Sequence, residues 1–193
     1  MSSLRRLLLS LAVVAAVAGA ACGDPPDKEM QQAQGAIDAA RAAGADQYAR
    51  AEFAAAEDAL KRARDAVDQH DYRQALNAAL DARERAQTAA KDTVNAKATA
   101  RAEAEKALAA ATAALNDARA KVRAENARGN PRTIAAARRT IASDETAVQE
   151  ARTAFEGGEY LASIEKAKGA TARLRAAIHD LDAATPTTGR RRH

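Results

Sequence analysis

The feature that most constrains this chain is the seven-residue spacing of its few large apolar side chains. Two segments show it most clearly: Phe53, Leu60 and Val67, and then Ile134, Ile141, Val148 and Phe155. A step of seven returns to nearly the same face of an α-helix every two turns, so each segment presents one narrow apolar stripe. This spacing predicts helices that pack lengthwise on one another.

The rest of the composition agrees with helix. The chain has no Trp and few aromatic residues, and its most frequent residues, led by alanine, are strong helix formers. Oppositely charged residues fall four apart, as in Glu57 with Lys61 and Asp81 with Arg85. The sequence therefore predicts an all-α protein.

Residues that favour turns divide this helix into segments. Gly44 is suited to a left-handed cap after a helix over 27–43, and Asp46 is expected to cap the next helix, which ends near Gln69. Asp71, followed by Gln74, resembles a capping box for a third helix. The expected helices cover residues 27–43, 46–69, 72–128, 131–157 and 159–183.

The third of these helices is unusually long. No breaker occurs between Asp71 and Gly129, which predicts about 55 residues of helix, or roughly 80 Å. Its weakest helix formers, residues 92–95, are a place where it could bend. Asn130 is expected to cap the following helix, with Pro131 in its first position.

An internal repeat with an offset of 88 residues organises these segments. Positions 53, 60 and 67 match 141, 148 and 155, and Tyr72 matches Tyr160. We therefore expect an elongated antiparallel helical bundle of two three-helix modules, residues 27–99 and 100–183, that share the long central helix. The arrangement is similar to consecutive spectrin repeats in architecture, without implying their function.

The N-terminus has the layout of a signal peptide. Arg5 and Arg6 precede an apolar run too short to span a membrane, and small residues lead to Cys22, the only cysteine. The run Gly19-Ala20-Ala21-Cys22 resembles a lipoprotein lipobox, although Gly19 replaces the usual aliphatic residue. The resemblance implies removal of residues 1–21 and lipidation of Cys22, followed by a short leader over 22–26. The alternative is an ordinary secretory signal that leaves a free thiol.

A second resemblance covers residues 33–90. The run Ala36–Ala45, followed by Tyr48-Ala49 and later Asp71-Tyr72, resembles a family of alanine-rich bacterial envelope lipoproteins catalogued only as a domain of unknown function. The chain departs from that family at Ala49-Arg50-Ala51, where Ala-Pro-Glu is usual, and it carries a degenerate second copy. The turn at Asp71-Tyr72 also resembles the middle of a tetratricopeptide repeat. The family implies a helical envelope domain and supplies no catalytic residues.

Charge argues against a nucleic-acid partner. Residues 22–189 carry 25 Lys and Arg against 26 Asp and Glu, so the excess of positive charge comes from the two ends. A nucleic-acid binder needs a basic face on its folded domain. Residues 184–193 are expected to form a disordered basic tail, in which Arg190–Arg192 either hold an anionic surface or serve only solubility.

No residue pattern indicates catalysis. His70, His179 and His193 lack partners at metal-ligand spacing, and Ser143 and Ser163 lack the glycines of a nucleophile elbow. The tyrosines Tyr48, Tyr72 and Tyr160 fit helix-turn packing better than a ligand site. Carboxylates are interpreted as lying on solvated faces. We therefore expect no catalytic, cofactor-binding or metal-binding residues.

The sequence predicts a non-enzymatic cell-envelope lipoprotein that acts as a helical spacer or interaction scaffold in the periplasm. Its expected partners are a membrane, through the lipid on Cys22, and cell wall or an envelope protein. Gly23 rather than Asp after the cysteine resembles the signal for the outer membrane in a diderm source. The alternative is a binding module that captures a peptide or partner helix in a groove between helices. A large exposed apolar patch favours the module, and a uniformly charged surface favours the spacer.

Overall fold

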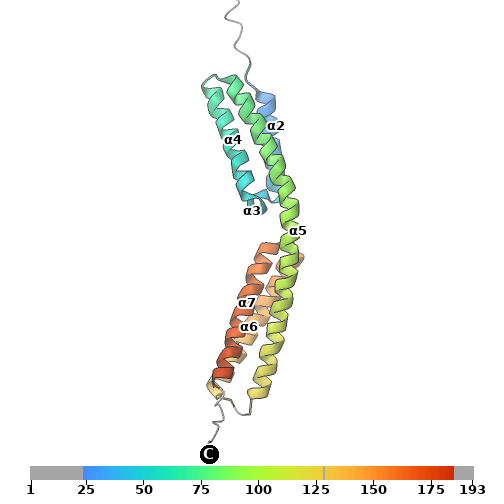
Figure 1. Cartoon of the computed structure of the whole chain (residues 1–193), viewed down its shortest axis with the longest axis vertical. Helices are drawn as coiled ribbons and strands as arrows, with labels where there is room; N and C mark the ends of the chain where they lie inside the picture. Colours follow the sequence, from blue (N-terminus) through green and yellow to red (C-terminus); the bar gives the residue numbers. More distant parts are fainter. Residues whose placement is uncertain (1–23, 128, 185–193) are drawn as a thin grey trace, which may run out of the picture. The chain divides into compact units, whose positions relative to one another are not determined.

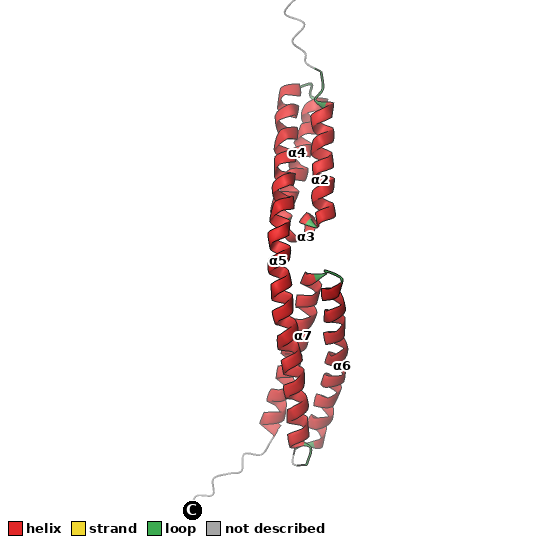
Figure 2. Ribbon diagram, turned by 90° about the vertical axis from the view of Figure 1, so that its right-hand side faces the viewer, coloured by secondary structure: helices red, strands yellow, loops and turns green. Residues whose placement is uncertain are grey.

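The computed structural model describes residues 24–127 and 129–184, and these residues form helices joined by short turns (Figure 1, Figure 2). The helices are α2 (Asp27–Ala43), α3 (Ala45–Tyr48), α4 (Arg50–Asp68), α5 (Tyr72–Glu125), α6 (Pro131–Glu156) and α7 (Tyr160–Ala184). The prediction of an all-α helical bundle is confirmed. Residues 1–21, Cys22, Gly23 and the tail from residue 185 lie outside the described residues.

Contacts divide the chain into two units. Unit 1 comprises residues 1–96 and unit 2 comprises residues 97–193. Helix α5 supplies the third helix of unit 1 with its first part and the first helix of unit 2 with its last part. Each unit therefore contains three long helices: α2, α4 and α5 in unit 1, and α5, α6 and α7 in unit 2.

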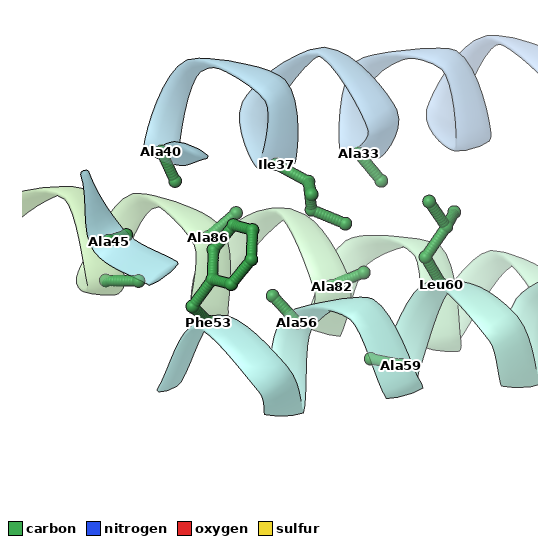
Figure 3. Packing of buried hydrophobic residues seen from close by; sticks show 11 residues of the cluster. Ala33, Ile37, Ala40, Ala45, Phe53, Ala56, Ala59, Leu60, Ala82 and Ala86 are labelled. Carbon is green, nitrogen blue, oxygen red and sulfur yellow. The ribbon is translucent and has the colours of Figure 1, made fainter. Parts of the chain in front are cut away.

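The core of unit 1 consists of a few large side chains set among alanines. Figure 3 shows Ile37 of α2 and both Phe53 and Leu60 of α4 pointing into the space between the helices. These side chains are 2%, 5% and 4% exposed, and they meet alanines of α5 such as Ala82 and Ala86. Methyl side chains let helix axes approach closely, so a thin core can still exclude water.

The core of unit 2 has two parts. The part nearer the α5–α6 connection holds larger side chains, including Leu115, Ile141 and Leu174. The other part contains Val148 surrounded almost entirely by alanines. Ile141 in the first part and Val148 in the second lie on the seven-residue stripe of α6.

The connection between α2 and α4 differs from the prediction. Gly44 has the expected left-handed backbone, with φ 94°, and its N–H donates to the carbonyl oxygens of Ala40 and Arg41. Asp46, however, does not cap the next helix but lies inside the short helix α3. Because Ala45 is completely buried, the chain turns into the core directly after Gly44, and α4 starts only after the break at Ala49 (φ −134°, ψ 46°).

The other predicted caps are confirmed. The Asp71 Oδ1 accepts a 2.9 Å hydrogen bond from the Gln74 N–H, which starts α5. The Asn130 Oδ1 accepts a 2.9 Å bond from the Arg132 N–H, with Pro131 in the first turn of α6. Helix α5 continues without a break through residues 92–95, where the Thr93 hydroxyl donates to the Ala89 carbonyl at 2.7 Å.

The sequence repeat appears as repeated hydrogen bonding in the turns before α5 and α7. In unit 1 the Asp71 N–H donates to the Ala66 carbonyl at 2.9 Å, and in unit 2 the Glu159 N–H donates to the Ala154 carbonyl at 2.8 Å. The residue before each donor has positive φ: 58° at His70 and 78° at Gly158. The two turns are copies of one structure, related by the offset of 88 residues.

Two contacts between the first and second helices are also repeated. The pairs of unit 1 and their counterparts in unit 2 are Arg41–Glu57 with Arg119–Glu145, and Arg64–Gln34 with Arg152–Thr112. In these contacts, matched residues of the second helices are 88 positions apart in the sequence, whereas matched residues of the first helices are only 78 positions apart. The stretch of chain between the matched contacts is therefore ten residues longer in unit 2, because α5 and α6 extend further before they are connected. The connection itself has no counterpart of α3 among the described residues.

Candidate functional site

The predicted lipidation site, Cys22, lies outside the described residues, so the structure gives it no surroundings. The described chain starts with Asp24-Pro25-Pro26, and the Pro25 carbonyl accepts a 2.8 Å bond from the Asp27 N–H at the start of α2. None of the described helices combines the length and apolar character needed to cross a bilayer.

The described histidines lie in separate places. His70 is in the turn before α5, where its Nδ1 is 3.2 Å from the Tyr72 hydroxyl. His179 is an exposed residue of α7, with its Nδ1 3.8 Å from an Asp180 carboxylate oxygen. Nowhere in the described ranges do three His, Cys, Asp or Glu side chains gather as a metal site would need. His193 lies outside the described residues.

The candidate serines and tyrosines are also dispersed. Ser143 is exposed on α6, whereas Ser163 is completely buried in α7. The Tyr160 ring lies 5.5 Å from the Phe155 ring, centroid to centroid, and Tyr48 and Tyr72 are half-buried near helix ends. The structure does not bring these residues together into one site.

The sequence interpretation that carboxylates lie on solvated faces missed an ion pair whose carboxylate is buried. Asp144 of α6 has no exposed surface, and its Oδ1 accepts hydrogen bonds from the Arg173 Nε at 2.8 Å and Nη2 at 2.6 Å. Its Oδ2 has no hydrogen-bond partner among the described residues. The repeat offered a signal, because Asp144 matches Ala56, a core residue of unit 1.

Two lysines of unit 2, the exposed Lys166 and the half-buried Lys121, tie its helices together. The hydrogen bond from Lys166 lowers the pKa of Glu150, and the pKa of Lys166 is raised by the same contact, whose length is 2.6 Å. Lys121 contacts Asp182 of α7 and also Glu125, at 3.4 Å. The hydrogen bond with Asp182 is the main cause of the raised pKa of Lys121.

A concavity with an apolar floor lies between α5 and α7 in unit 2. This groove has a volume of about 460 Å³. Its lining residues are Glu103, Lys106, Ala107 and Ala110 of α5, and Lys168, Thr171, Ala172 and Arg175 of α7. Alanine and threonine thus line its floor, while three cationic side chains and one carboxylate surround it. We refer to it as the α5–α7 groove.

At the matched place in unit 1 a hydrogen bond bridges the two helices, and a concavity of about 420 Å³ lies beside it, lined by α5 residues that include Leu80 and Gln87. With the offsets given above, Ala110 matches Gln32 and Thr171 matches Arg83. The Arg83 Nη1 donates to the Gln32 Oε1 at 2.7 Å, across α2 and α5. In unit 2 two short side chains, Ala110 and Thr171, replace this long pair and form part of the floor of the α5–α7 groove.

Comparison with known proteins identifies part of the chain. Residues 28–105 match the family described as "Domain of unknown function (DUF4398)". No curated protein and no solved structure matches the chain. The matched segment covers α2, α3, α4 and the first part of α5, so it supports a domain of unknown function over unit 1 and leaves most of the α5–α7 groove outside the match.

Proposed function

We propose that this protein is a non-enzymatic lipoprotein of the cell envelope that acts as a helical spacer or interaction scaffold. The N-terminal sequence supports the anchor: a basic start, a short apolar run and small residues before Cys22. Acylation of that cysteine places the helical units next to a membrane. In a diderm source the membrane is the outer one, and the units face the periplasm.

The observation that carries the scaffold role is α5, a single helix of 54 residues that serves two units of the same design. A helix of that length extends about 80 Å at 1.5 Å per residue. Helical units in series keep a partner at a distance from the membrane more reproducibly than an unstructured linker does.

The surface of the described residues also suits a spacer. Ion pairs connect neighbouring helices or successive turns at many exposed positions: Arg41–Glu57, Arg62–Asp81, Arg85–Glu52, Arg101–Glu105, Arg119–Glu145 and Lys166–Glu150. The large apolar side chains exposed in the described part, Leu80, Val94 and Leu161, are far apart in the sequence. A charged surface of this kind favours solubility over self-association.

Lipidation is tested by metabolic labelling with an alkyne fatty acid and by fractionation of cells that express the full chain. The wild type should incorporate the label and sediment with membranes, whereas Cys22→Ser should do neither, because thioether acylation needs the sulfur. Ser143→Ala, an exposed change on α6, is the control and should behave as the wild type. Absence of label on the wild type would overturn the anchored reading.

The second candidate function is a binding module, and the α5–α7 groove is the observation that favours it. A groove between two helices accepts a third helix or an extended segment. The two functions are compatible, since a scaffold acts by holding partners. Small-angle scattering of the lipid-free chain tests the spacer: an elongated particle supports it, and a compact sphere contradicts it.

A further inference from the structure

We propose that the α5–α7 groove is a docking site for an acidic amphipathic helix of a partner protein. The inference rests on the scaffold function proposed above and names the chemistry of its partner. It follows from the shape of the groove, the charge of its rim and the contrast with unit 1.

The floor of the groove suits a helix. Ala107 and Ala110 are three residues apart on α5, so both methyl groups lie on one face, and Thr171 and Ala172 provide short side chains from α7. Small side chains along a two-helix groove let a third backbone approach closely. The occupant therefore presents its own apolar stripe to this floor.

The rim of the groove selects an acidic occupant. Lys106, Lys168 and Arg175 are exposed, and the described residues give none of them an ion-pair partner within 4 Å. Glu103 is the one carboxylate of the lining. Cations placed along both walls attract Glu and Asp side chains that flank the stripe of a bound helix, which sets both specificity and the rate of encounter.

Unit 1 shows a bridged version of the same groove. Its Gln32–Arg83 hydrogen bond joins the helices at the positions of Ala110 and Thr171, and Leu80 and Gln87 stand at the positions of Lys168 and Arg175. Unit 1 therefore differs in two ways: a polar bridge crosses the place of Ala110 and Thr171, and two of the three cations are replaced by uncharged side chains. The docking site belongs to unit 2, in the part of the chain that the family match barely reaches.

The probe is a fluorescent amphipathic peptide of about 20 residues, long enough for stable helix, with an alanine–leucine stripe and glutamate elsewhere. Its binding to the full chain, measured by fluorescence anisotropy at low salt, should be saturable and should weaken as salt rises. Two control peptides define the chemistry: one with lysine in place of glutamate, and one of the same composition interrupted by central prolines. Neither should bind.

Charge-reversal variants test the rim. Lys106→Glu, Lys168→Glu and Arg175→Glu should each weaken binding by about two- to fivefold, as expected for exposed ion pairs. Lys61→Glu, an exposed change in unit 1, should leave binding unchanged. If the rim variants bind as tightly as the wild type, the proposal is wrong.

A filled groove tests the shape. Ala110→Gln combined with Thr171→Arg recreates the pair of unit 1 inside unit 2. This variant adds a positive charge, so attraction by charge alone would strengthen binding, whereas occlusion of the floor should abolish it. Circular dichroism checks that this variant is folded. If it is not folded, the rim variants still test the proposal, because they change only exposed side chains.

The remaining outcomes separate this proposal from others. Equal binding of the proline-interrupted peptide or of an unstructured polyglutamate would replace the helical partner by an anionic polymer and overturn the inference. Absence of peptide binding, with normal labelling of Cys22, would overturn the groove and leave the anchored scaffold in place. Peptide binding without labelling of Cys22 would support the groove and overturn the lipid anchor.

Discussion

Unit 1 and unit 2 carry an arginine at matched positions of their third helices, but the two side chains find carboxylates in different places. Arg85 bonds to Asp81 at 2.9 Å and approaches Glu52 at 3.5 Å, both on the surface. Arg173 instead bonds to Asp144, which is completely buried.

The replaced residues explain this difference. Thr140 and Gly169 stand in unit 2 where unit 1 has Glu52 and Asp81, so Arg173 has lost both surface partners. Gly169 also gives room, since a Cβ at that position would come within 3.3 Å of the Arg173 Nη1. The comparison shows that a repeated helical framework can move the carboxylate of an ion pair from its surface into its core through a few substitutions.

The largest expected difference between the units concerns these two arginines. Arg173→Ala leaves the Asp144 charge buried without a partner and should cost about 3 to 5 kcal/mol of the free energy of unfolding. Arg85→Ala removes only exposed pairs and should cost less than about 1 kcal/mol. Urea unfolding followed by circular dichroism measures both.

The partner variant sharpens the same comparison. Asp144→Ala restores the alanine of unit 1 and leaves Arg173, whose side chain is 55% exposed, free to turn to water. Its cost should therefore be clearly smaller than that of Arg173→Ala. Equal costs for all three variants would mean that burial of Asp144 does not distinguish the two units.

The next largest effect is expected at the matched core positions Leu60 and Val148, which are 4% and 2% exposed. Truncation of each to alanine should cost about 1 to 4 kcal/mol, with Leu60→Ala the larger because it removes more apolar volume. Thermal unfolding of each variant measures the loss. A negligible effect at either position would show that the thin alanine core does not hold its unit together.

A smaller effect is expected at two glycines, one in the turn before α7 and one inside α2. Gly158 has φ 78° and no neighbour within 4 Å of an added Cβ, so Gly158→Ala should cost about 1 to 2 kcal/mol through backbone strain alone. Gly35→Ala, inside α2 and equally free of neighbours, should instead stabilise by about 1 kcal/mol. Opposite signs in thermal unfolding support this reading; a loss at both glycines contradicts it.

The smallest expected effect is a pH dependence that comes from the Lys166–Glu150 pair of unit 2. Because Lys166 lowers the pKa of Glu150, this carboxylate stabilises the fold above its ordinary pKa of about 4.3, and the contribution is lost as pH falls through the lowered value. The pKa of Lys166 is raised in the folded state. Its contribution to stability is therefore fully present below its ordinary pKa of about 10.4 and is lost as pH rises through the raised value.

The positions in unit 1 that match Glu150 and Lys166 are Arg62 and Ala78, so no equivalent pair exists there. Glu150→Gln should flatten the acid side of a plot of melting temperature against pH at low salt, and added salt should erase the difference because both side chains are exposed. An unchanged acid limb in Glu150→Gln would remove this pair from the account.

The helices and most of their ends were predictable because their causes are local. The stripe through Phe53 and Leu60 determines which face is buried, and Asp71 and Asn130 cap their helices with their own side chains. The break between α3 and α4 was not predictable in this way, because it depends on Ala45 packing into a core formed by other helices.

The candidate groove could not be predicted from the apolar stripe of a single helix. Its opening depends on which side chains of α5 and α7 face one another, and the matched pair Gln32–Arg83 is recognisable only with the offset of 78 residues between the first helices. Asp144 was partly recoverable, since it lies between Ile141 and Val148 on the buried stripe. An aspartate is expected to face solvent, but its position on the buried stripe places Asp144 in the core.

The most direct test of this account is hydrogen–deuterium exchange of the full chain, with and without Arg173→Ala, read by mass spectrometry. The central claim is that two matched units are stabilised separately, although α5 belongs to both. Amide exchange should accelerate across residues 97–184 in the variant and stay unchanged across residues 27–68, because the lost contact lies within unit 2. Equal acceleration in α2 and α4 would contradict the claim and show that the chain unfolds as one cooperative structure.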